Sequence, residues 1–599
     1  MRSGSPRRSS APALSFKKRR RRRVLPLLLV LVVLGGLGGG GYLLLKPSAD
    51  EPSAKEDLVR ACDVDVAILE RMWNGYVPNR SGDVLAVEHA PNQYSTRHSS
   101  PYPYHQDVPL VLYGPGFIRS GQTVDRPVTV ADLAPTYAKL LGFDDFPKRD
   151  GRVLQEALLP ERKRNGVPKL IFTLVWDGGG DNVLQEWPDD WPELAELRGQ
   201  GTDYTGATVG STPSITPSVH ATIGTGAFPH THGITDTRMR VKNKMKDPWE
   251  QSSPKRMRSK TLGDLWDAAN GNAPLVGMMA RDAWHLGMVG SGAYLPEGDH
   301  DIAVLDELGG IEFRTNEDYY SLPDYLLGLD GLEEAVAEVD QRDGESDGEW
   351  LGNPILSYDA QVRFTPAWSI FQTEKMVELL ETEGFGIDDV ADLFYVNYKP
   401  VDLAGHFWNM VEPEVQENLR ETDAQLPAII EALDRIVGED DYVLALTADH
   451  GMTPYAHVSG GWDIETRDMS EDIEKRFDKV TPDKPLILSN RGYQIMLDRD
   501  EMRRNKVTAA QVAAFVRDYR IEDNVTDTNK VLPRFEERTR ERLFLTALTP
   551  DALEEALACA RDRAAASMRK DRRYAYGVPQ REVSLALRTL ARNSGFPTT

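Results

Sequence analysis

The most constraining feature of the chain is a set of short apolar runs of the kind that form strands buried on both faces. They occupy residues 170–176, 393–398 and 442–447. Runs of this length that are rich in β-branched and aromatic residues are typical of the centre of a parallel sheet. Helical patterns lie between them, most clearly at residues 415–436. Strands that alternate with helices predict an α/β fold, in which helices sandwich a mainly parallel sheet and a ligand site lies along its carboxyl edge.

Several polar residues stand where these predicted elements end or begin. Asp177 directly follows the first run, and Asp449 and His450 follow the last one. Asp402 and His406 are four residues apart, so a helical turn would project both side chains from one face. Taken singly, each could be a turn or surface residue. Together, carboxylates and imidazoles at one sheet edge predict a metal site, and two ions about 4 Å apart can hold both the attacking and the leaving oxygen of a displacement reaction.

Thr216 supplies a hydroxyl group beside this predicted site. It precedes Pro217 and the helix-like segment 218–223. A metal-bound hydroxyl at a helix N-terminus loses its proton more easily and becomes a nucleophile. The same N-terminus presents backbone N–H groups that bind phosphate. The simpler interpretation is that Thr216 only caps the helix.

These motifs resemble those of the alkaline phosphatase superfamily, and the branch they resemble most is that of the type I phosphodiesterases and nucleotide pyrophosphatases. The matching segments are Asp177-Gly, residues 214–226 (SITPSVHATIGTG), His232-Gly-Ile, Asp402-x3-His406 and Asp449-His-Gly-Met. The resemblance implies hydrolysis of phosphodiester or pyrophosphate bonds through a phospho-threonine intermediate on Thr216. It also implies two divalent metal ions, with zinc expected. One ion would be held by Asp402, His406 and a further histidine, and the other by Asp177, Thr216, Asp449 and His450.

The further histidine stands at an unexpected place in the chain. In the family it follows the Asp-His-Gly motif within a pattern like His-Gly-Ser-Pro-Tyr, but here only His457 follows, too close to His450. A similar pattern, His98-Ser-Ser-Pro-Tyr, occurs near the N-terminus, and residues 130–142 after it resemble the helix that closes the family's domain. We therefore predict a circular permutation, in which residues 60–160 form the family's C-terminal block and His98 is the missing ligand. The alternative is that His98 is a surface histidine.

Two departures from the family bear on the substrate. Where the diesterase branch has a phosphate-binding asparagine, this chain has Thr237 with Arg238 beside it. We predict that both bind substrate, with Arg238 supplying charge in the transition state. A sulfatase that uses formylglycine is not expected, because residues 216–220 lack the arginine of the sulfatase motif.

Three other functions remain compatible with the same residues. A phosphomonoesterase would need further basic contacts, for which Lys242, Lys244 and Lys246 are nearby in sequence. A transferase would pass the phospho group to a lipid or glycan hydroxyl instead of water. A non-catalytic, membrane-tethered binding protein would have lost ligands, whereas a candidate occupies every ligand position here.

The N-terminus predicts a membrane anchor. Residues 1–23 contain ten Lys and Arg and no acidic residue, and residues 24–45 carry no charge. An uncharged run of this length spans a bilayer core of about 30 Å. Basic residues stay in the cytoplasm, so the catalytic domain is predicted to be extracytoplasmic. A cleaved signal peptide is the alternative, although its apolar region is usually shorter.

Charge and cysteine content limit the partners. The net charge is −23, and residues 1–23 contribute +10, so the remainder carries −33. Such acidity repels nucleic acid, so we expect a phosphate-ester small molecule or a lipid or glycan head group rather than a nucleic acid polymer. Cys62 and Cys559 are the only cysteines. They could form one disulfide in an oxidising compartment, but the sequence does not decide this.

The remaining organisation is predicted from composition. Residues 46–59 form a polar linker, residues 165–460 the main catalytic core, and residues 461–599 an α+β extension to which we assign no chemistry. The core is predicted to contain an acidic, irregular insertion at about 300–360. This insertion could cap the site and set the size of the leaving group.

Overall fold

The computed structural model describes residues 60–94, 98–306, 312–355, 361–480, 484–525 and 531–570, with side chains up to residue 565. The predicted cytoplasmic segment, membrane anchor and linker lie outside these residues. None of the helices in the described ranges is both long and apolar enough to cross a bilayer. The membrane anchor therefore stays a prediction.

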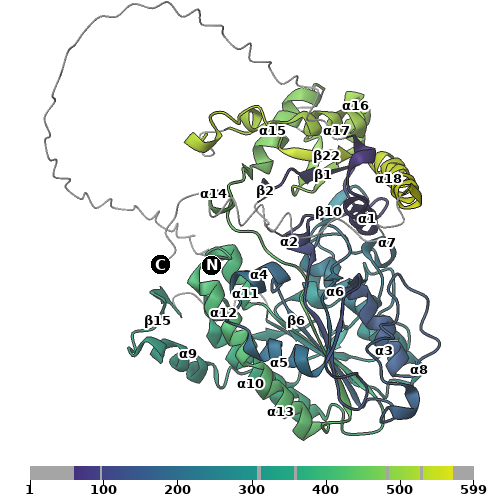
Figure 1. Cartoon of the computed structure of the whole chain (residues 1–599), viewed down its shortest axis with the longest axis vertical. Helices are drawn as coiled ribbons and strands as arrows, with labels where there is room; N and C mark the ends of the chain where they lie inside the picture. The colour runs from purple at the N-terminus through teal and green to yellow at the C-terminus, as the bar shows by residue number, and fades with distance from the viewer. Residues whose placement is uncertain are drawn as a thin grey trace, which may run out of the picture. The chain divides into compact units, whose positions relative to one another are not determined.

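A mixed ten-stranded sheet forms the centre of the fold (Figure 1). Its five central strands are mutually parallel and are, in spatial order, β12 (Asp301–Asp306), β11 (Val276–Ala280), β17 (Asp392–Tyr398), β6 (Leu170–Trp176) and β18 (Tyr442–Thr447). The outer strands are β3 (Leu110–Tyr113), β7 (Thr202–Tyr204), β4 (Gln122–Val124), β13 (Phe313–Arg314) and β14 (Tyr320–Ser321). The predicted α/β class is confirmed. The sheet is mixed because β3 runs antiparallel to both β18 and β7.

Helices cover both faces of this sheet, as the alternation of side chains along β6 requires. Leu170, Phe172 and Leu174 point into one apolar core, and Ile171 and Val175 point into the other. The first core is covered by α5 (Pro192–Gln200), α10 (Pro366–Glu383), α12 (Pro413–Ala424) and α13 (Leu426–Ile436). The second is covered by α3 (Leu133–Leu140), α6 (Thr216–Thr225) and α8 (Leu262–Ala269). Because successive residues face opposite sides, every residue of β6 is buried.

The helical pattern predicted at residues 415–436 forms two helices, α12 and α13. Pro427 lies in the first turn of α13. Proline has no backbone N–H, and its ring blocks the carbonyl group four residues earlier. A continuous helix through this position is therefore excluded.

A second, smaller sheet combines both ends of the described chain. Its order is β20 (Ile487–Asn490), β21 (Gln494–Leu497), β1 (Val84–Glu88) and β22 (Phe544–Leu548), and all neighbours are antiparallel. It packs with α1 (Val66–Gly75), α15 (Thr466–Phe477), α16 (Arg499–Asn505), α17 (Ala509–Asp518) and α18 (Pro550–Lys570). A disulfide joins Cys62 to Cys559 in α18. Residues 60–160 thus contribute to both the small sheet, through β1, and the main sheet, through β3 and β4.

The predicted irregular insertion at 300–360 is wrong at its start. Residues 301–306 form β12, a fully buried strand of the main sheet. The acidic residues Asp301 and Asp306 at its two ends concealed the apolar centre. Further on, α9 (Leu332–Asp340) buries Leu332 and Val339 against α10 (Figure 1).

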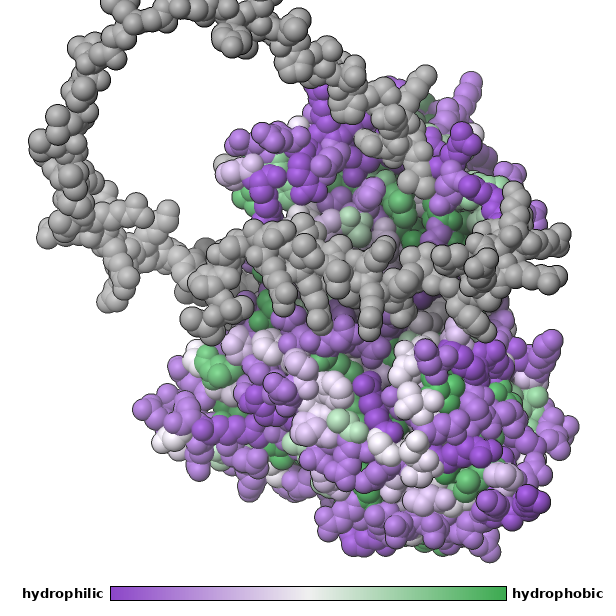
Figure 2. Space-filling view, in the orientation of Figure 1, coloured by the Kyte–Doolittle hydropathy of each residue, from purple (hydrophilic) through white to green (hydrophobic). Residues whose placement is uncertain are grey.

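The surface of the described part is strongly hydrophilic. Residues 341–349 are almost fully exposed, as the acidic composition predicted. Figure 2 shows hydrophilic residues over most of the visible described surface. This surface is consistent with the negative net charge of the chain.

Candidate active site

The predicted metal ligands meet at the carboxyl edge of the main sheet. In chain order they are His98, Asp177, Asp402, His406, Asp449 and His450. Two strands, β6 and β18, end just before three of them, and α11 (Pro400–Phe407), which begins directly after β17, carries two more. The remaining histidine precedes the short helix α2 (Pro103–Gln106).

One group consists of His98, Asp402 and His406, whose ligand atoms lie within 4.8 Å of one another. The Nε2 atoms of the two histidines are 3.1 Å apart, and His406 Nε2 lies 3.2 Å from Asp402 Oδ1. His98 Nδ1 lies 3.0 Å from the Ser214 carbonyl oxygen. Donation of Nδ1–H to that carbonyl leaves the Nε2 lone pair facing the group. His98 is only 5 % exposed, so it is not a surface histidine.

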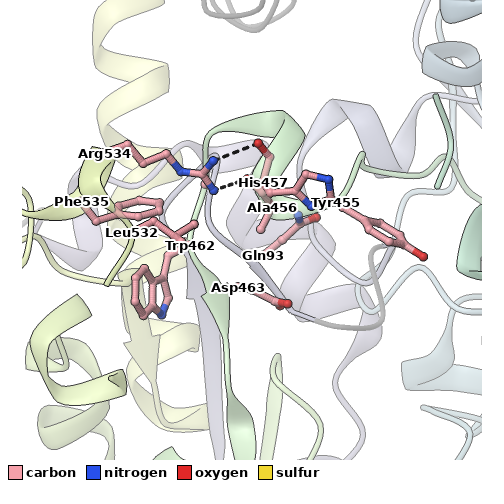
Figure 3. A pocket seen from close by; sticks show the side chains of 10 residues that line it. Gln93, Tyr455, Ala456, His457, Trp462, Asp463, Leu532, Arg534 and Phe535 are labelled. Atoms are coloured by element: carbon pink, nitrogen blue, oxygen red, sulfur yellow. Dashed lines mark hydrogen bonds between the residues drawn. The ribbon is translucent and has the colours of Figure 1, made fainter. Parts of the chain in front are cut away.

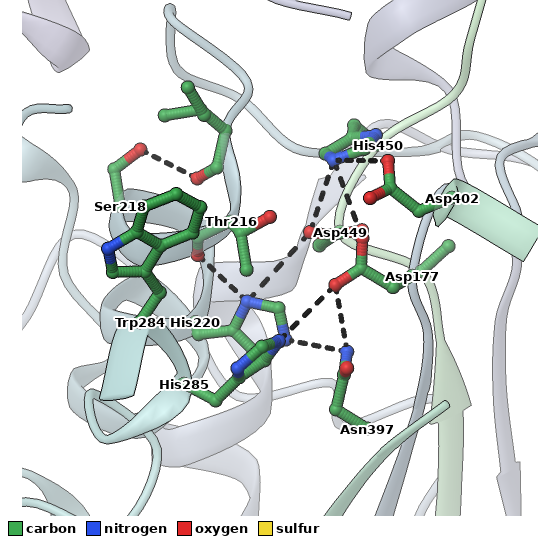
Figure 4. A network of polar contacts seen from close by, with 12 residues as sticks. Asp177, Thr216, Ser218, His220, Trp284, His285, Asn397, Asp402, Asp449 and His450 are labelled. Carbon is green, nitrogen blue, oxygen red and sulfur yellow. Dashed lines mark hydrogen bonds and ion pairs between the residues drawn. The ribbon is translucent and has the colours of Figure 1, made fainter. Parts of the chain in front are cut away.

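The other group consists of Asp177, Asp449 and His450, again within 4.8 Å. His450 Nε2 is 3.3 Å from Asp449 Oδ2 and 3.7 Å from Asp177 Oδ1 (Figure 4). It is also 4.0 Å from Asp402 Oδ1, and its ring stacks on that of His98 at 3.8 Å. The two groups are therefore neighbours in one centre.

Buried atoms without partners show that this centre fits cations. Within the described residues, Asp402 Oδ1, Asp449 Oδ2 and His450 Nε2 are buried and have no hydrogen-bond partner. Burying such atoms unpaired is unfavourable. Burial, together with the neighbouring imidazoles, also holds the pKa of His98 well below its usual range, so its ring is neutral and able to ligate. Three carboxylates and three imidazoles form a donor set suited to two divalent ions of the zinc type.

Thr216 opens helix α6 beside these groups and is 3 % exposed. The preceding Ile215 is extended, so the chain enters the helix abruptly at the hydroxyl-bearing residue. His220, one turn later, is 2.8 Å through Nδ1 from the Thr216 carbonyl oxygen (Figure 4). The fold thus fixes the backbone of Thr216 at the N-terminus of a buried helix.

Lys399 is a central residue that the sequence analysis missed. Its Nζ donates to Asp177 Oδ1 at 2.6 Å and to Thr216 Oγ1 at 3.2 Å, and it lies 2.8 Å from Asp402 Oδ2. Burial opposes the charge of this lysine, but Asp177 and Asp402 outweigh burial and raise its pKa above the usual range. In the same way, burial works to raise the pKa of Asp177, but the Lys399 ammonium lowers it overall. Lys399 therefore stays charged and links both groups to the hydroxyl.

Contacts from Asn397 and His285 orient the other oxygen of Asp177. Asn397 Nδ2 donates to Asp177 Oδ2 at 3.1 Å, and His285 Nε2 lies 3.4 Å from the same atom. Burial disfavours a charged His285, but hydrogen bonds to Asp177 and Asp282 raise its pKa to about 9. With Oδ2 held in this way, Oδ1 of Asp177 faces Lys399 and His450.

Comparison with known families identifies the family to which the chain belongs. The sequence profile of the family "Type I phosphodiesterase / nucleotide pyrophosphatase" matches residues 171–570, more than half of the chain. The chain belongs to this family. It therefore lies in the nucleotide-pyrophosphatase-like branch of the alkaline phosphatase superfamily, and the family membership supports phosphoester hydrolysis.

Individual relatives are distant. Alkaline phosphatase PafA of Elizabethkingia meningoseptica is 23% identical over 424 residues, which cover 61% of this chain and 76% of the relative. A crystal structure of PafA covers 58% of this chain and 76% of its own, with 18% identity and a TM-score of 0.47. Murine ectonucleotide pyrophosphatase/phosphodiesterase 5, solved as an inactive variant with AMP, covers 63% and 78%, with 13% identity and a TM-score of 0.35.

Thr237 and Arg238, the two residues predicted to bind substrate, are not part of the groups that the predicted metal ligands form. The Thr237 hydroxyl donates to Asp236 Oδ1 at 3.2 Å, and the Arg238 side chain is exposed. Among the described residues, no hydrogen bond or ion pair joins either one to Thr216 or to the two ligand groups. Their role in binding substrate therefore stays a prediction.

Other basic residues were also considered from the sequence. Lys242, Lys244 and Lys246 belong to a hairpin of β9 (Met239–Val241) and β10 (Lys244–Lys246), where Lys246 pairs with Glu250 at 2.8 Å. Arg281, which directly follows β11, was not considered. It is 8 % exposed, its Nη1 is buried without a hydrogen-bond partner among the described residues, and its charge interacts with those of Asp282 and Asp306 and, more weakly, with that of Asp402. Besides Lys399, Arg281 is thus a basic side chain whose charge reaches the ligand groups.

A pocket of about 160 Å³ is lined by Gln93 and by residues from the segments 455–457, 461–463 and 532–535 (Figure 3). Trp462, Leu532 and Phe535 form its apolar side, and Arg534 donates to the carbonyl groups of Ala456 and His457 in α14 (Ala456–Ser459). Tyr455 also lines the pocket, and its hydroxyl donates to the backbone carbonyls of His406 and Phe407. The pocket wall is therefore directly bonded to the helix that carries Asp402.

Proposed function

We propose that the protein is a metal-dependent hydrolase of phosphodiester or pyrophosphate bonds that works through a phospho-threonine intermediate. The observation that carries this proposal is the position of the Thr216 hydroxyl, 3.2 Å from an ammonium that bridges the carboxylates of both ligand groups. A nucleophile placed between two metal sites is the arrangement that in-line phosphoryl transfer requires.

The residues divide into two sites for divalent ions, for which we propose zinc. His98, Asp402 and His406 would hold one ion, and the other would be held by Asp177, Thr216, Asp449 and His450. Two ions bound there would polarise the phosphoryl oxygens and lower the pKa of the nearby hydroxyl group. Asn397 and His285 keep Asp177 oriented toward the centre.

Side chains of the protein and the N-terminus of α6 then position the reacting atoms. Thr216 Oγ1 gives up its proton to solvent and attacks phosphorus; the new O–P bond forms as the bond to the leaving oxygen breaks, and the leaving oxygen takes up a proton from solvent. Lys399 donates to Thr216 Oγ1 and so restricts its rotation. The N-terminus of α6 adds the positive end of a helix dipole next to the phosphoryl oxygens. Water then attacks phosphorus and releases Thr216 as a free hydroxyl.

Hydrolysis of p-nitrophenyl esters tests this proposal. Zinc-loaded full-length protein is expected to cleave a p-nitrophenyl phosphodiester faster than the monoester and to yield a phosphorylated Thr216 peptide by mass spectrometry after acid quenching. Thr216→Ala should lower turnover on the order of 10³-fold or more, while Thr216→Ser keeps a hydroxyl and part of the activity. Turnover unchanged in Thr216→Ala would refute the covalent route. Metal binding without turnover of either ester would favour transfer to a lipid or glycan hydroxyl.

Arg281 favours phosphomonoester hydrolysis as a second candidate. A monoester presents one more charged oxygen than a diester, and Arg281, whose charge interacts weakly with that of Asp402, has a buried Nη1 without a hydrogen-bond partner among the described residues. Charge-assisted hydrogen bonds to a phosphoryl oxygen are strong in such a site. Arg281→Met should therefore lower kcat/KM for the monoester more than for the diester. An equal effect on both esters would exclude this role.

The circular permutation is supported by the pairing of β1 with β22. These strands are antiparallel neighbours, with Leu85 opposite Leu548. The end of β22 thus lies beside the start of β1, where a short turn would join them in an unpermuted chain. A rearranged gene that runs from residue 165 to 570 and continues through a flexible linker into residues 60–160 should fold and bind two metals. Failure to fold would count against the permutation.

We also propose that the catalytic part is extracytoplasmic and anchored by residues 24–45. The pairing of Cys62 with Cys559 supports this location, because disulfides persist in oxidising compartments. Fusions of residues 1–59 to a reporter that is active only outside the cytoplasm test the orientation. Reporter activity that does not depend on residues 24–45 would refute the anchor.

A further inference from the structure

We propose that the protein holds a Ca²⁺ ion at a separate site formed by Asp267, Asp299 and Asp301. Asp301 is the first residue of β12, whereas the catalytic residues follow the last residues of parallel strands. The two sites therefore lie at opposite edges of the main sheet. Neither depends on the other, and the Ca²⁺ site does not rest on the proposed function.

Three different elements supply the carboxylates. Asp267 comes from the last turn of α8, Asp299 from the loop before β12, and Asp301 from β12 itself. One oxygen of each lies within 4.8 Å of the others. Ca²⁺ binds oxygens at about 2.3–2.6 Å, so oxygens that share one ion are separated by at most about 5 Å. The spacing therefore matches a single ion.

A buried atom without a partner points into the same place. Asp267 is 6 % exposed, and its Oδ1 has no hydrogen-bond partner within the described residues. Asp267 and Asp301 both line a small cavity of about 20 Å³. A single water-sized particle needs about 10–15 Å³, so this cavity has room for one ion.

The charged groups around the cavity carry a net negative charge. Asp264 also lines it, but its two oxygens accept hydrogen bonds from the backbone N–H groups of Thr261 and Ser291 at 2.8 and 2.7 Å. Lys260 is the basic residue in the lining, and its side chain is exposed. One exposed ammonium therefore faces three carboxylates in the lining, and the exposed Asp299 lies next to two of them. Buried carboxylates this close repel one another unless a cation or a shared proton compensates.

The donor atoms select the class of ion. All three predicted ligands are carboxylates, so the site suits a hard cation rather than zinc, which favours nitrogen and sulfur. Mg²⁺ demands near-octahedral geometry and keeps several waters, whereas Ca²⁺ accepts irregular arrangements from helix, loop and strand. Bound Ca²⁺ would fasten the end of α8 to the start of β12.

Thermal unfolding of the zinc-loaded full-length protein tests the site, because zinc keeps the catalytic ligands occupied. Millimolar CaCl₂ is expected to raise the Tm by on the order of 2–3 °C. Isothermal titration calorimetry should give one Ca²⁺ per chain. Asp301→Asn and Asp267→Asn should remove both effects, whereas Asp389→Asn, at an exposed position, should retain them.

The direction in which Asp267→Asn changes the Tm in Ca²⁺-free buffer shows whether the carboxylates form a cation site or only stabilise the fold. If the carboxylates await a cation, Asp267→Asn relieves repulsion and raises the Tm without Ca²⁺ while abolishing the Ca²⁺ response. A wild-type Tm that ignores Ca²⁺ would overturn the proposal and would mean that the carboxylates share a proton. An equal Ca²⁺ response in Asp301→Asn would overturn it as well.

Discussion

Lys399 neutralises carboxylates of the predicted metal site. Replacing it with methionine tests whether bound metal ions can neutralise these carboxylates in its place. Lys399 Nζ is 2.6 Å from Asp177 and 2.8 Å from Asp402, and all three residues are buried. Methionine keeps much of the volume but removes the ammonium. Removing one partner of a buried ion pair costs about 3–5 kcal/mol, because the other charge remains buried.

This free energy converts into a measurable shift. Unfolding entropy is about 2.1 cal/mol/K per residue, so a folded unit of roughly 500 residues loses about 1 °C of Tm per kcal/mol. Lys399→Met should therefore unfold about 3–5 °C below the wild type in EDTA. With zinc bound, the ions neutralise the same carboxylates, and the difference should largely disappear. Differential scanning fluorimetry in EDTA and in zinc measures both values.

Lys375→Met is a matched control. Lys375 lies on α10, is 6 % exposed, and pairs with Glu378 at 2.9 Å away from the metal ligands. Its replacement should lower the Tm equally in EDTA and in zinc. If Lys399→Met also lost the same amount in both buffers, Lys399 would be a fixed structural partner, and the idea of metal substitution would be refuted.

Three further predictions address the ligand set, a buried acid and the disulfide. His98→Ala should lower the bound zinc from two ions per chain to one, as measured by inductively coupled plasma mass spectrometry. If two ions were retained, His98 would not be a metal ligand. Burial raises the pKa of Glu88 to about 8 from 4.5, so the folded state keeps a proton that the unfolded chain releases. Stability should thus fall between pH 4.5 and pH 8 by up to about 1.4 kcal/mol per pH unit, and urea unfolding of Glu88→Gln should lack this slope. Cys62→Ser opens a loop of 497 residues and should lower stability by about 2–5 kcal/mol; an unchanged urea midpoint would contradict this.

The sequence predicted those parts of the molecule that local patterns determine. The runs at 170–176 and 442–447 coincide with β6 and β18, because a strand buried on both faces needs an unbroken apolar segment of that length. The ligands that follow such strands were predictable for the same reason. His98 was found only through the family pattern, since a lone histidine in a Ser/Tyr loop carries no local signal.

Lys399 and Arg281 escaped prediction because their roles arise from strand register. Tyr398 of β17 pairs with Trp176 of β6, so the next residues, Lys399 and Asp177, end side by side. No property of Lys399 in its own segment indicates this neighbour. β12 was missed for a different reason: its terminal aspartates resemble the acidic loop that follows. Pro427, in contrast, marks in the sequence the point near which the helical segment 415–436 divides into two helices.

The charge of the metal-loaded centre connects Lys399 to the choice of substrate. Metal ligands must be ionised, so Asp177, Asp402 and Asp449 contribute three negative charges, Lys399 one positive charge, and two divalent ions four. The loaded centre then carries a charge of +2, and of +1 once Thr216 Oγ1 has lost its proton, which balances a diester monoanion. Lys399→Met would remove one of these positive charges. We therefore expect this variant to lower kcat/KM for p-nitrophenyl phosphate more than for the diester, because the lost Coulomb attraction is larger for the doubly charged ester. Equal losses for both esters would show that Lys399 acts by holding Thr216 in place and not by setting the charge of the centre.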